Sequence, residues 1–238
     1  MIENTIKSIR FHLPESRIIV MCDGVRPNVE FRRWQYVGYK EHLKQMVRDG
    51  DLSNVVWCEW VDYSQQAKMM RETLDIMVTT PYVLFCEHDG ELVSTHNPRD
   101  GHQETRQEDC EIAWQDIIDL LDSGGANIVR FYAWDEIYSG HAHLMQGQMI
   151  QGASRFIKTT QYSQWPHIAR TDFYKKMLAD HFRPDEIRMI EIGMYGSVGA
   201  APWTQYRIVI YAPDGNMRRF YHRNGRADEN GVQDPVDW

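Results

Sequence analysis

The sequence predicts an α/β fold in which helices flank a mostly parallel, mixed sheet. Three segments, 17–23, 54–59 and 82–87, run through apolar residues to a cysteine and then an acid. Stretches with helical spacing of apolar residues separate them, and such alternation is typical of parallel sheets. The 238 residues, 42% of them hydrophobic, suffice for one domain spanning residues 1–238.

Strands and helices alternate through the first half of the chain. The predicted helices are Ile2 to Leu13, Asn28 to Arg48, Ser64 to Val78 and Asp109 to Asp122. The predicted strands are Arg17 to Cys22, Asn54 to Glu59, Tyr82 to Cys86 and Asn127 to Trp134. The polar composition from Glu91 to Glu108 predicts a surface loop beside the third strand.

The second half contains fewer clear patterns. We expect a strand from Arg155 to Thr160 and helices from Thr171 to His181 and from Glu186 to Val198. Two strands, Tyr206 to Ala212 and Met217 to His222, flank Pro213-Asp214-Gly215-Asn216, whose residues are typical of turns. The chain is therefore expected to end in a hairpin.

Composition narrows the class of protein. A net charge of -8 argues against a broad nucleic-acid surface, and the strongest local basic strip consists of Arg218, Arg219, Arg223 and Arg226. The four cysteines are far apart and form no CxxC pair, which favours free thiols in a reducing cytoplasm. No apolar run is long enough to predict a membrane span.

Two carboxylates follow the third predicted strand. Glu87 and Asp89 lie on the same side of an extended backbone, so both side chains are expected to face one hard cation, Mg²⁺ or Mn²⁺. If the three acid-ended strands are neighbours, Asp23, Glu59 and Glu87 gather at one sheet edge. The alternative is that an acid simply marks the exposed end of a buried strand. We favour that alternative for Glu59 and metal binding for Glu87 and Asp89.

The order of elements in the first half resembles the nucleotide-sugar half of GT-A glycosyltransferases, especially family 2. The resemblance rests on the first helix, the strand ending in Cys22-Asp23-Gly24, the helix 64–78 and the segment Thr80 to Asp89. The resemblance implies a Rossmann-like nucleotide-binding half in 1–134 and an acceptor-binding half in 135–238. Asp23 matches the nucleotide-binding acid, and Glu87-His88-Asp89 matches the DxD motif with Glu in place of the first Asp. Family members begin with a strand that precedes the helix seen here, so upstream residues or another segment are expected to complete the sheet.

The resemblance also implies a reaction. It predicts metal-dependent, inverting transfer from a nucleoside-diphosphate sugar, such as a UDP-sugar, to an acceptor hydroxyl, as in a hexosyltransferase. His222 matches a C-terminal metal ligand, while Arg223 and Arg226 match groups that grip donor phosphates. For His222 the alternative is a purely structural histidine. The runner-up functions are a sugar nucleotidyltransferase, whose Gly-rich basic loop is missing here, and a non-catalytic nucleotide-sugar-binding module.

On the acceptor side, the resemblance points to Glu191 as the general base, with Asp185 and Glu186 as nearby competitors. It also implies an acceptor pocket lined by Trp165, His167 and Arg170. A packed aromatic beside a helix start explains Trp165 equally well. The acceptor stays open among a saccharide, a protein and a hydroxylated base in DNA, as in viral base-modifying glycosyltransferases.

Overall fold

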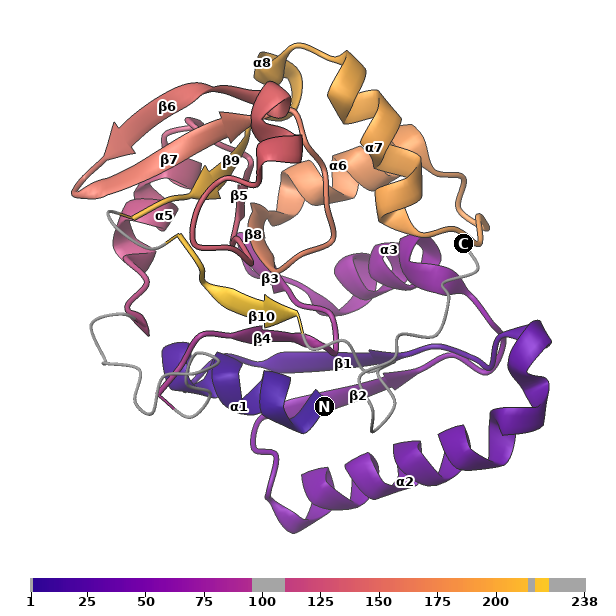
Figure 1. The fold of residues 1–238 in the computed structure, drawn as a ribbon. Helices are drawn as coiled ribbons and strands as arrows, with labels where there is room; N and C mark the ends of the chain where they lie inside the picture. The colour runs from indigo at the N-terminus through magenta and orange to yellow at the C-terminus, as the bar shows by residue number, and fades with distance from the viewer. Residues whose placement is uncertain (1, 96–109, 214–216, 223–238) are drawn as a thin grey trace.

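The structure, a computed structural model, describes residues 2–95, 110–213 and 217–222 (Figure 1). Its first half contains α1 (Ile2–His12), β1 (Ile18–Cys22), η1 (Pro27–Arg32), α2 (Arg33–Asp49), β2 (Val55–Glu59), α3 (Gln65–Met77), β3 (Tyr82–Phe85), β4 (Gly90–Leu92), α5 (Trp114–Asp122) and β5 (Ile128–Arg130). The second half contains η2 (Ser139–Leu144), β6 (Met145–Gln151), β7 (Ser154–Thr159), β8 (His167–Arg170), α6 (Thr171–His181), α7 (Ile190–Ala200), α8 (Trp203–Tyr206), β9 (Ile208–Tyr211) and β10 (Phe220–His222). Among the described residues, no helix is both long and apolar enough to cross a bilayer.

The predicted mixed α/β architecture with flanking helices is confirmed. Six strands form the main sheet in the order β3-β8-β5-β9-β7-β6, while β1 with β2 and β4 with β10 form two smaller sheets. Among the described strand pairs, β1 with β2 and β5 with β9 are parallel, and the others are antiparallel. The sheet is thus less parallel than the alternation of elements predicts, because β8 and β7, from the second half, insert beside strands of opposite direction.

The condition under which Asp23, Glu59 and Glu87 would gather at one sheet edge is not met, because the three acid-ended strands are not all neighbours. β1 and β2 pair with each other, but β3 pairs with β8 in the main sheet. Parallel pairing does bring Cys22 opposite Glu59. The third acid-ended strand therefore reaches its site from a different sheet.

The predicted C-terminal hairpin is also wrong. β9 lies inside the main sheet between β5 and β7, whereas β10 pairs with β4 in antiparallel register. Leu92 and Phe220 face each other in that register and are both 0% exposed, so burial of apolar surface stabilises the pairing. The surface loop predicted from Glu91 accordingly begins with a buried strand, and its remainder from 96 to 108 lies outside the described residues.

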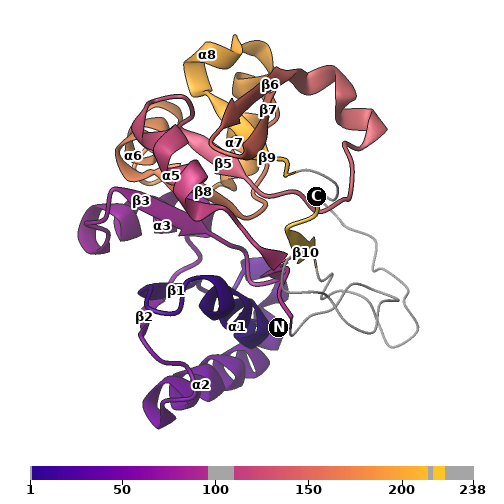
Figure 2. The ribbon, with the colours of Figure 1, turned by 90° about the vertical axis from the view of Figure 1, so that its left-hand side faces the viewer.

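Helices cover both faces of the main sheet (Figures 1 and 2). Successive strand residues point to opposite faces: Ile128 and Ile208 pack against α3, α6 and α7, whereas Val129 and Val209 pack on the side of α5. Helices α1 and α2 instead contribute to a smaller core around β1 and β2.

The N-termini of α3 and α7 meet near the end of β3. The backbone N–H of Ala67, in the first turn of α3, donates to the carbonyl of Arg188, two residues before α7, at 3.0 Å. This contact brings the start of α7 from the second half of the chain to the first turn of α3. The candidate site lies where these helix starts approach the residues that follow β3.

Candidate functional site

The two predicted metal-binding carboxylates and the predicted histidine come together. β4 follows Asp89 directly, and its pairing with β10 places His222 opposite Gly90. As a result His222 Nε2 lies 3.3 Å from Asp89 Oδ2. Gly90 has a second role, because a Cβ there would lie only 3.0 Å from Pro166 Cγ, so glycine lets β4 approach the segment that follows Trp165.

Glu87 occupies a partly buried position that disfavours its charge. Burial and the neighbouring charge of Asp89 raise its pKa to about 7, although a hydrogen bond from Gln66 opposes that rise. Gln66 Nε2 donates to Glu87 Oε1 at 2.9 Å, and Gln164 donates in turn to Gln66. Two glutamines from distant parts of the chain thus orient this carboxylate.

Asp89 has the opposite protonation behaviour. Burial alone would raise its pKa, but the hydrogen bond from His222 and the nearby histidine charges outweigh burial and lower it. The same hydrogen bond raises the pKa of His222, against the effect of its own burial. Asp89 is only 16% exposed, and its other oxygen, Oδ1, is buried without a hydrogen-bond partner among the described residues.

Glu87 and Asp89 fit a cation that takes some of its ligands from the protein and the rest from water and substrate. Within residues 2–95, 110–213 and 217–222, no group of three or more His, Cys, Asp and Glu side chains is placed to hold a metal ion. Mg²⁺ and similar ions commonly take one or two protein carboxylates and complete their shell with water and substrate phosphates. The unpartnered Asp89 Oδ1 beside a second carboxylate fits that kind of binding.

Glu191 lies in the first turn of α7 and belongs to the same electrostatic cluster. Its negative charge helps to raise the pKa of both Glu87 and His222. It also acts on Arg130, whose pKa burial lowers to about 10 while the charge of Glu191 opposes that change. The structure therefore brings the predicted base to the predicted metal ligands.

Arg130 was not predicted as a site residue. It ends β5, is 1% exposed, and donates from Nη1 to the Gln161 carbonyl at 2.9 Å, whereas Nε and Nη2 have no hydrogen-bond partner among the described residues. Its guanidinium carbon lies 5.6 Å from the ring centroid of Trp165. An arginine in an apolar strand carries no local sequence signal for such a position.

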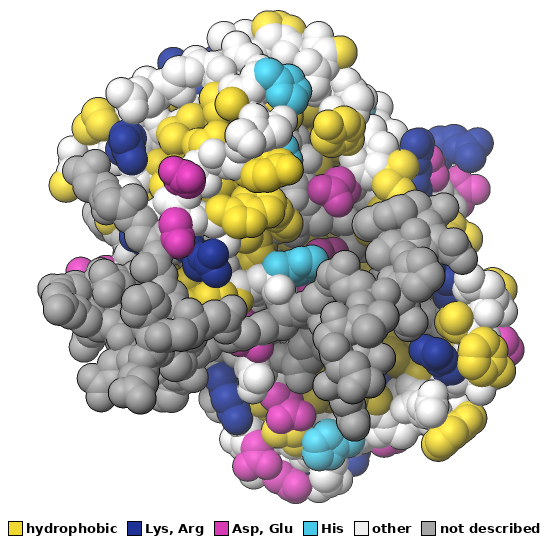
Figure 3. Space-filling view, viewed as in Figure 1, with side chains coloured by type: hydrophobic (Ala, Val, Ile, Leu, Met, Phe, Trp, Pro, Cys, Tyr) yellow, Lys and Arg dark blue, Asp and Glu magenta, His cyan; other side chains and the backbone are white. Residues whose placement is uncertain are grey.

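Trp165 belongs to an aromatic cluster beside the acids. We use the name aromatic cluster for Tyr132, Trp134, Tyr138, His141 and Trp165. Trp165 packs on Phe220, two residues before His222, with 5.4 Å between ring centroids. Trp134 and Tyr138 stack at 5.4 Å and are 37% and 52% exposed. Figure 3 shows hydrophobic side chains next to acidic and histidine side chains near the middle of one face.

Asp23 and Glu59 are held in different surroundings. Asp23 accepts the backbone N–H groups of Gly24, Ser64 and Gln65 at 2.7 to 3.0 Å, so its carboxylate binds the start of α3. Glu59 pairs with Lys40 and, at 2.8 Å, with Lys44, and these hydrogen bonds lower its pKa to about 2. Glu59 thus follows the alternative favoured from the sequence, a structural acid at a strand end.

The two predicted acceptor residues on β8 occupy different surroundings. His167 is 0% exposed, stacks on Phe85 and has a pKa lowered to about 4 by burial, so it is a neutral core residue. Arg170 lies opposite Tyr82, at the end of β3 remote from Glu87. Because β8 runs antiparallel to β3, His167 lies opposite Phe85, two residues before Glu87, whereas Arg170 lies at the far end of the strand. The contact of these two side chains with an acceptor stays a prediction. Arg223 and Arg226 lie outside the described residues.

Comparison with known proteins supports the fold alone. No protein-family model and no curated protein sequence matches this chain. A crystal structure of S. aureus TarS 1-349 is similar over 94% of this chain, with a TM-score of 0.51 and 13% identity, and the chain spans 57% of that structure. UDP-glucose pyrophosphorylase complexed with UDP-glucose matches over 92% of this chain and 78% of its own, with a TM-score of 0.44 and 10% identity. The chain thus has a mixed α/β fold similar to that of the TarS structure.

Proposed function

We propose that this protein transfers a sugar from a nucleoside-diphosphate sugar to an acceptor hydroxyl in a metal-dependent reaction. The observation that carries the proposal is the cluster of Glu87, Asp89, His222 and Glu191 at the end of β3. Departure of a nucleoside diphosphate leaves an oxocarbenium-like sugar and concentrates negative charge on phosphate oxygens. The site therefore needs both a cation and a base, and this cluster supports both.

On the donor side, Glu87 and Asp89 would hold Mg²⁺ or Mn²⁺, which supplies charge neutralisation to the leaving diphosphate. His222 orients Asp89 through its hydrogen bond and leaves Oδ1 available to the ion. Gln66 orients Glu87, and a bound cation would keep that carboxylate ionised at neutral pH despite its raised pKa. Binding of Asp23 to backbone amides at the start of α3 supports only an indirect donor role, shaping the loop.

On the acceptor side, we assign the general base to Glu191. It would accept the proton of the attacking hydroxyl as that oxygen forms a bond to the anomeric carbon and the bond to the phosphate oxygen breaks. Attack from the face opposite the leaving group inverts the anomeric configuration. Glu191 interacts electrostatically with the buried guanidinium of Arg130 and with Glu87, which places it in the same site as the proposed metal ligands.

The aromatic cluster favours a saccharide acceptor. Exposed Trp134 and Tyr138 offer flat apolar faces, suited to the C–H face of a sugar ring. A DNA acceptor is less well supported, because Arg218 pairs with Asp135 at 3.3 Å and Arg219 is 6% exposed.

Trp134→Ala should raise the KM for a saccharide acceptor about tenfold, with donor hydrolysis unchanged. Trp34→Ala, at an exposed tryptophan on α2, is the control; an equal effect of both would contradict a stacking role.

The central test is Asp89→Asn. The substitution keeps the size of the side chain but removes its charge, so metal-dependent release of nucleoside diphosphate from a sugar nucleotide should fall at least about 100-fold. Mass spectrometry over a panel of sugar nucleotides, with Mn²⁺ or with chelator, measures the release. Full activity of Asp89→Asn would sink the metal assignment, and activity only with added pyrophosphate would indicate a nucleotidyltransferase.

A further inference from the structure

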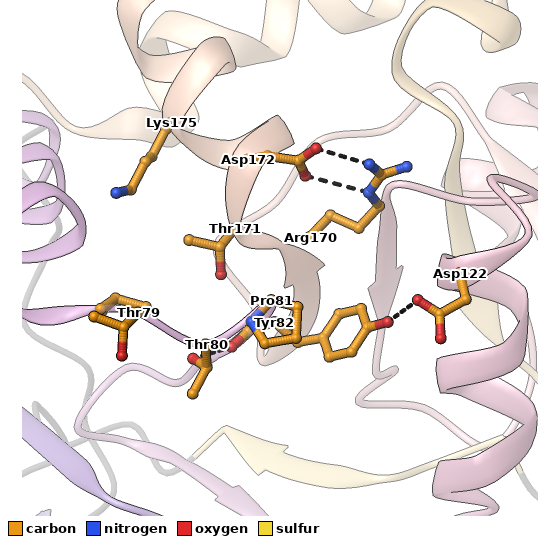
Figure 4. A pocket seen from close by; sticks show the side chains of 10 residues that line it. Thr79, Thr80, Pro81, Tyr82, Asp122, Arg170, Thr171, Asp172 and Lys175 are labelled. Atoms are coloured by element: carbon orange, nitrogen blue, oxygen red, sulfur yellow. Dashed lines mark hydrogen bonds and ion pairs between the residues drawn. The ribbon is translucent and has the colours of Figure 1, made fainter.

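A second concave site lies at the opposite end of β3 from the acid cluster. It is a cavity of about 520 Å³ between the segment that enters β3 and the start of α6 (Figure 4). Tyr82 and Glu87 are five residues apart, roughly 16 Å along an extended strand, so this cavity is separate from the proposed donor site. Its size falls within the range of ordinary ligand pockets.

Polar side chains from four elements, β3, α5, β8 and α6, surround this cavity. Arg170 holds Asp172 through two hydrogen bonds, Nε to Oδ1 at 3.2 Å and Nη2 to Oδ2 at 2.7 Å. Tyr82 donates its hydroxyl to Asp122 at the end of α5, as Figure 4 shows. Lys175, from the second turn of α6, adds a cation 3.7 Å from Asp75.

The charges of the cavity disfavour an ionic ligand. The two cations, Arg170 and Lys175, already have acid partners, and the carboxylates of Asp122 and Asp172 also line the wall. An anion would lie close to these carboxylates, and a cation close to the arginine and the lysine. A neutral ligand rich in hydroxyl groups meets neither repulsion.

The remaining groups suit such a ligand. Arg170 has three further N–H donors, and the carboxylates offer further acceptor positions. Pro81 and the ring of Tyr82 provide apolar surface on the same wall. Thr171 Oγ1 is buried without a hydrogen-bond partner among the described residues and points toward the Pro81 side in Figure 4. Rotation of the Thr171 side chain toward the cavity would let Oγ1 hydrogen-bond a ligand hydroxyl and so recover the free energy that the missing partner costs.

We propose that this cavity binds a neutral saccharide unit, with Arg170 and Asp172 as the recognition pair and Tyr82 as the apolar wall. The site does not depend on the proposed transferase activity, since binding there requires no donor.

Saturation-transfer difference NMR tests the proposal on the full chain without sugar nucleotide. The probes are methyl α-D-glucopyranoside, methyl β-D-galactopyranoside and methyl N-acetyl-β-D-glucosaminide. We expect saturation transfer to at least one glycoside and roughly tenfold weaker binding in both Arg170→Ala and Asp172→Ala, since each removes hydrogen bonds of a charged group. Arg48→Ala, at an exposed arginine on α2 that contacts Gln45, should bind like the unsubstituted protein.

Three results would overturn the proposal. One is no transfer to any of the three glycosides. Another is binding that survives in Arg170→Ala but is lost in Trp134→Ala, which would place the sugar on the aromatic cluster. The third is a response of the amides of 79–82 and 170–175 to inorganic phosphate instead of to a glycoside. Donor hydrolysis is measured separately, so failure here leaves the proposed transferase testable.

Discussion

Glu59 and Glu87 end two strands with the same local pattern, an apolar run followed by cysteine and glutamate, yet their surroundings are opposite. Glu59 lies between Lys40 and Lys44, and its pKa falls to about 2. Glu87 lies next to Asp89 and is partly buried, and its pKa rises to about 7. Two lysines neutralise the first carboxylate, whereas we propose that a bound cation neutralises the second.

The difference lies in which elements pack on each strand end. β2 is covered by α2, whose lysines reach Glu59, whereas β3 ends among α3, α7 and β10, which contribute Gln66, Glu191 and His222. A structural acid therefore carries its own counter-charge. An acid whose charge is disfavoured in the folded protein is a better candidate for a site.

The largest difference between Glu59 and Glu87 is expected in the enzymatic activity of their glutamine variants. Glu87→Gln removes a carboxylate from the proposed metal site, so metal-dependent release of nucleoside diphosphate should fall about 100-fold. Glu59→Gln should change it by no more than about twofold. Initial rates under matched Mn²⁺ concentrations measure both variants. Equal losses in both would mean that strand-end stability, and not the metal site, controls the rate.

A smaller difference between Glu87 and Glu59 is expected in how the free energy of unfolding depends on pH. The folded pKa of Glu87, about 7, lies above its usual value of 4.5, so the folded state binds more protons between these values. The free energy of unfolding of the metal-free protein should therefore fall by the order of 2 kcal/mol as pH rises from 4.5 to 7. Urea unfolding of Glu87→Gln in the same range should lack this contribution, and an unchanged slope would contradict the raised pKa.

Glu59 should act at lower pH and in the opposite direction. Its folded pKa, about 2, lies below 4.5, so its stabilising contribution is present above pH 4.5 and is lost as pH falls toward 2. Because its side chain is 31% exposed, solvent screening limits that contribution to about 1 kcal/mol. The difference in unfolding free energy between the unsubstituted protein and Glu59→Gln should shrink over this acid range.

Strong local patterns allowed several elements to be predicted closely. Helix α6 spans Thr171–His181, as its apolar spacing predicts, and β1, β2 and β3 begin and end within a residue or so of expectation. Strand β4 was missed because Gly90-Glu91-Leu92 is short and the strand it pairs with, β10, is remote in sequence. The pairing of β10 with β4 is also the reason that the predicted hairpin is wrong. Turn residues indicate that the chain changes direction, but they do not indicate which strand the next segment pairs with.

In the candidate site, too, local sequence predicted some features and remote contacts determined others. The sequence predicts that Glu87 and Asp89 follow a strand, which is confirmed, but it places them on an extended backbone. In the structure β3 ends at Phe85, and the Gly90 N–H donates to the Glu87 carbonyl at 3.0 Å, so the two acids lie in a turn. Which acids are paired and which are not depends on groups far along the chain: Lys40 is 19 residues from Glu59, and Gln66 is 21 residues from Glu87. Local sequence therefore determines that an acid stands at or just after each strand end, whereas the packing of remote helices and strands determines its charge, because pKa depends on neighbours in space.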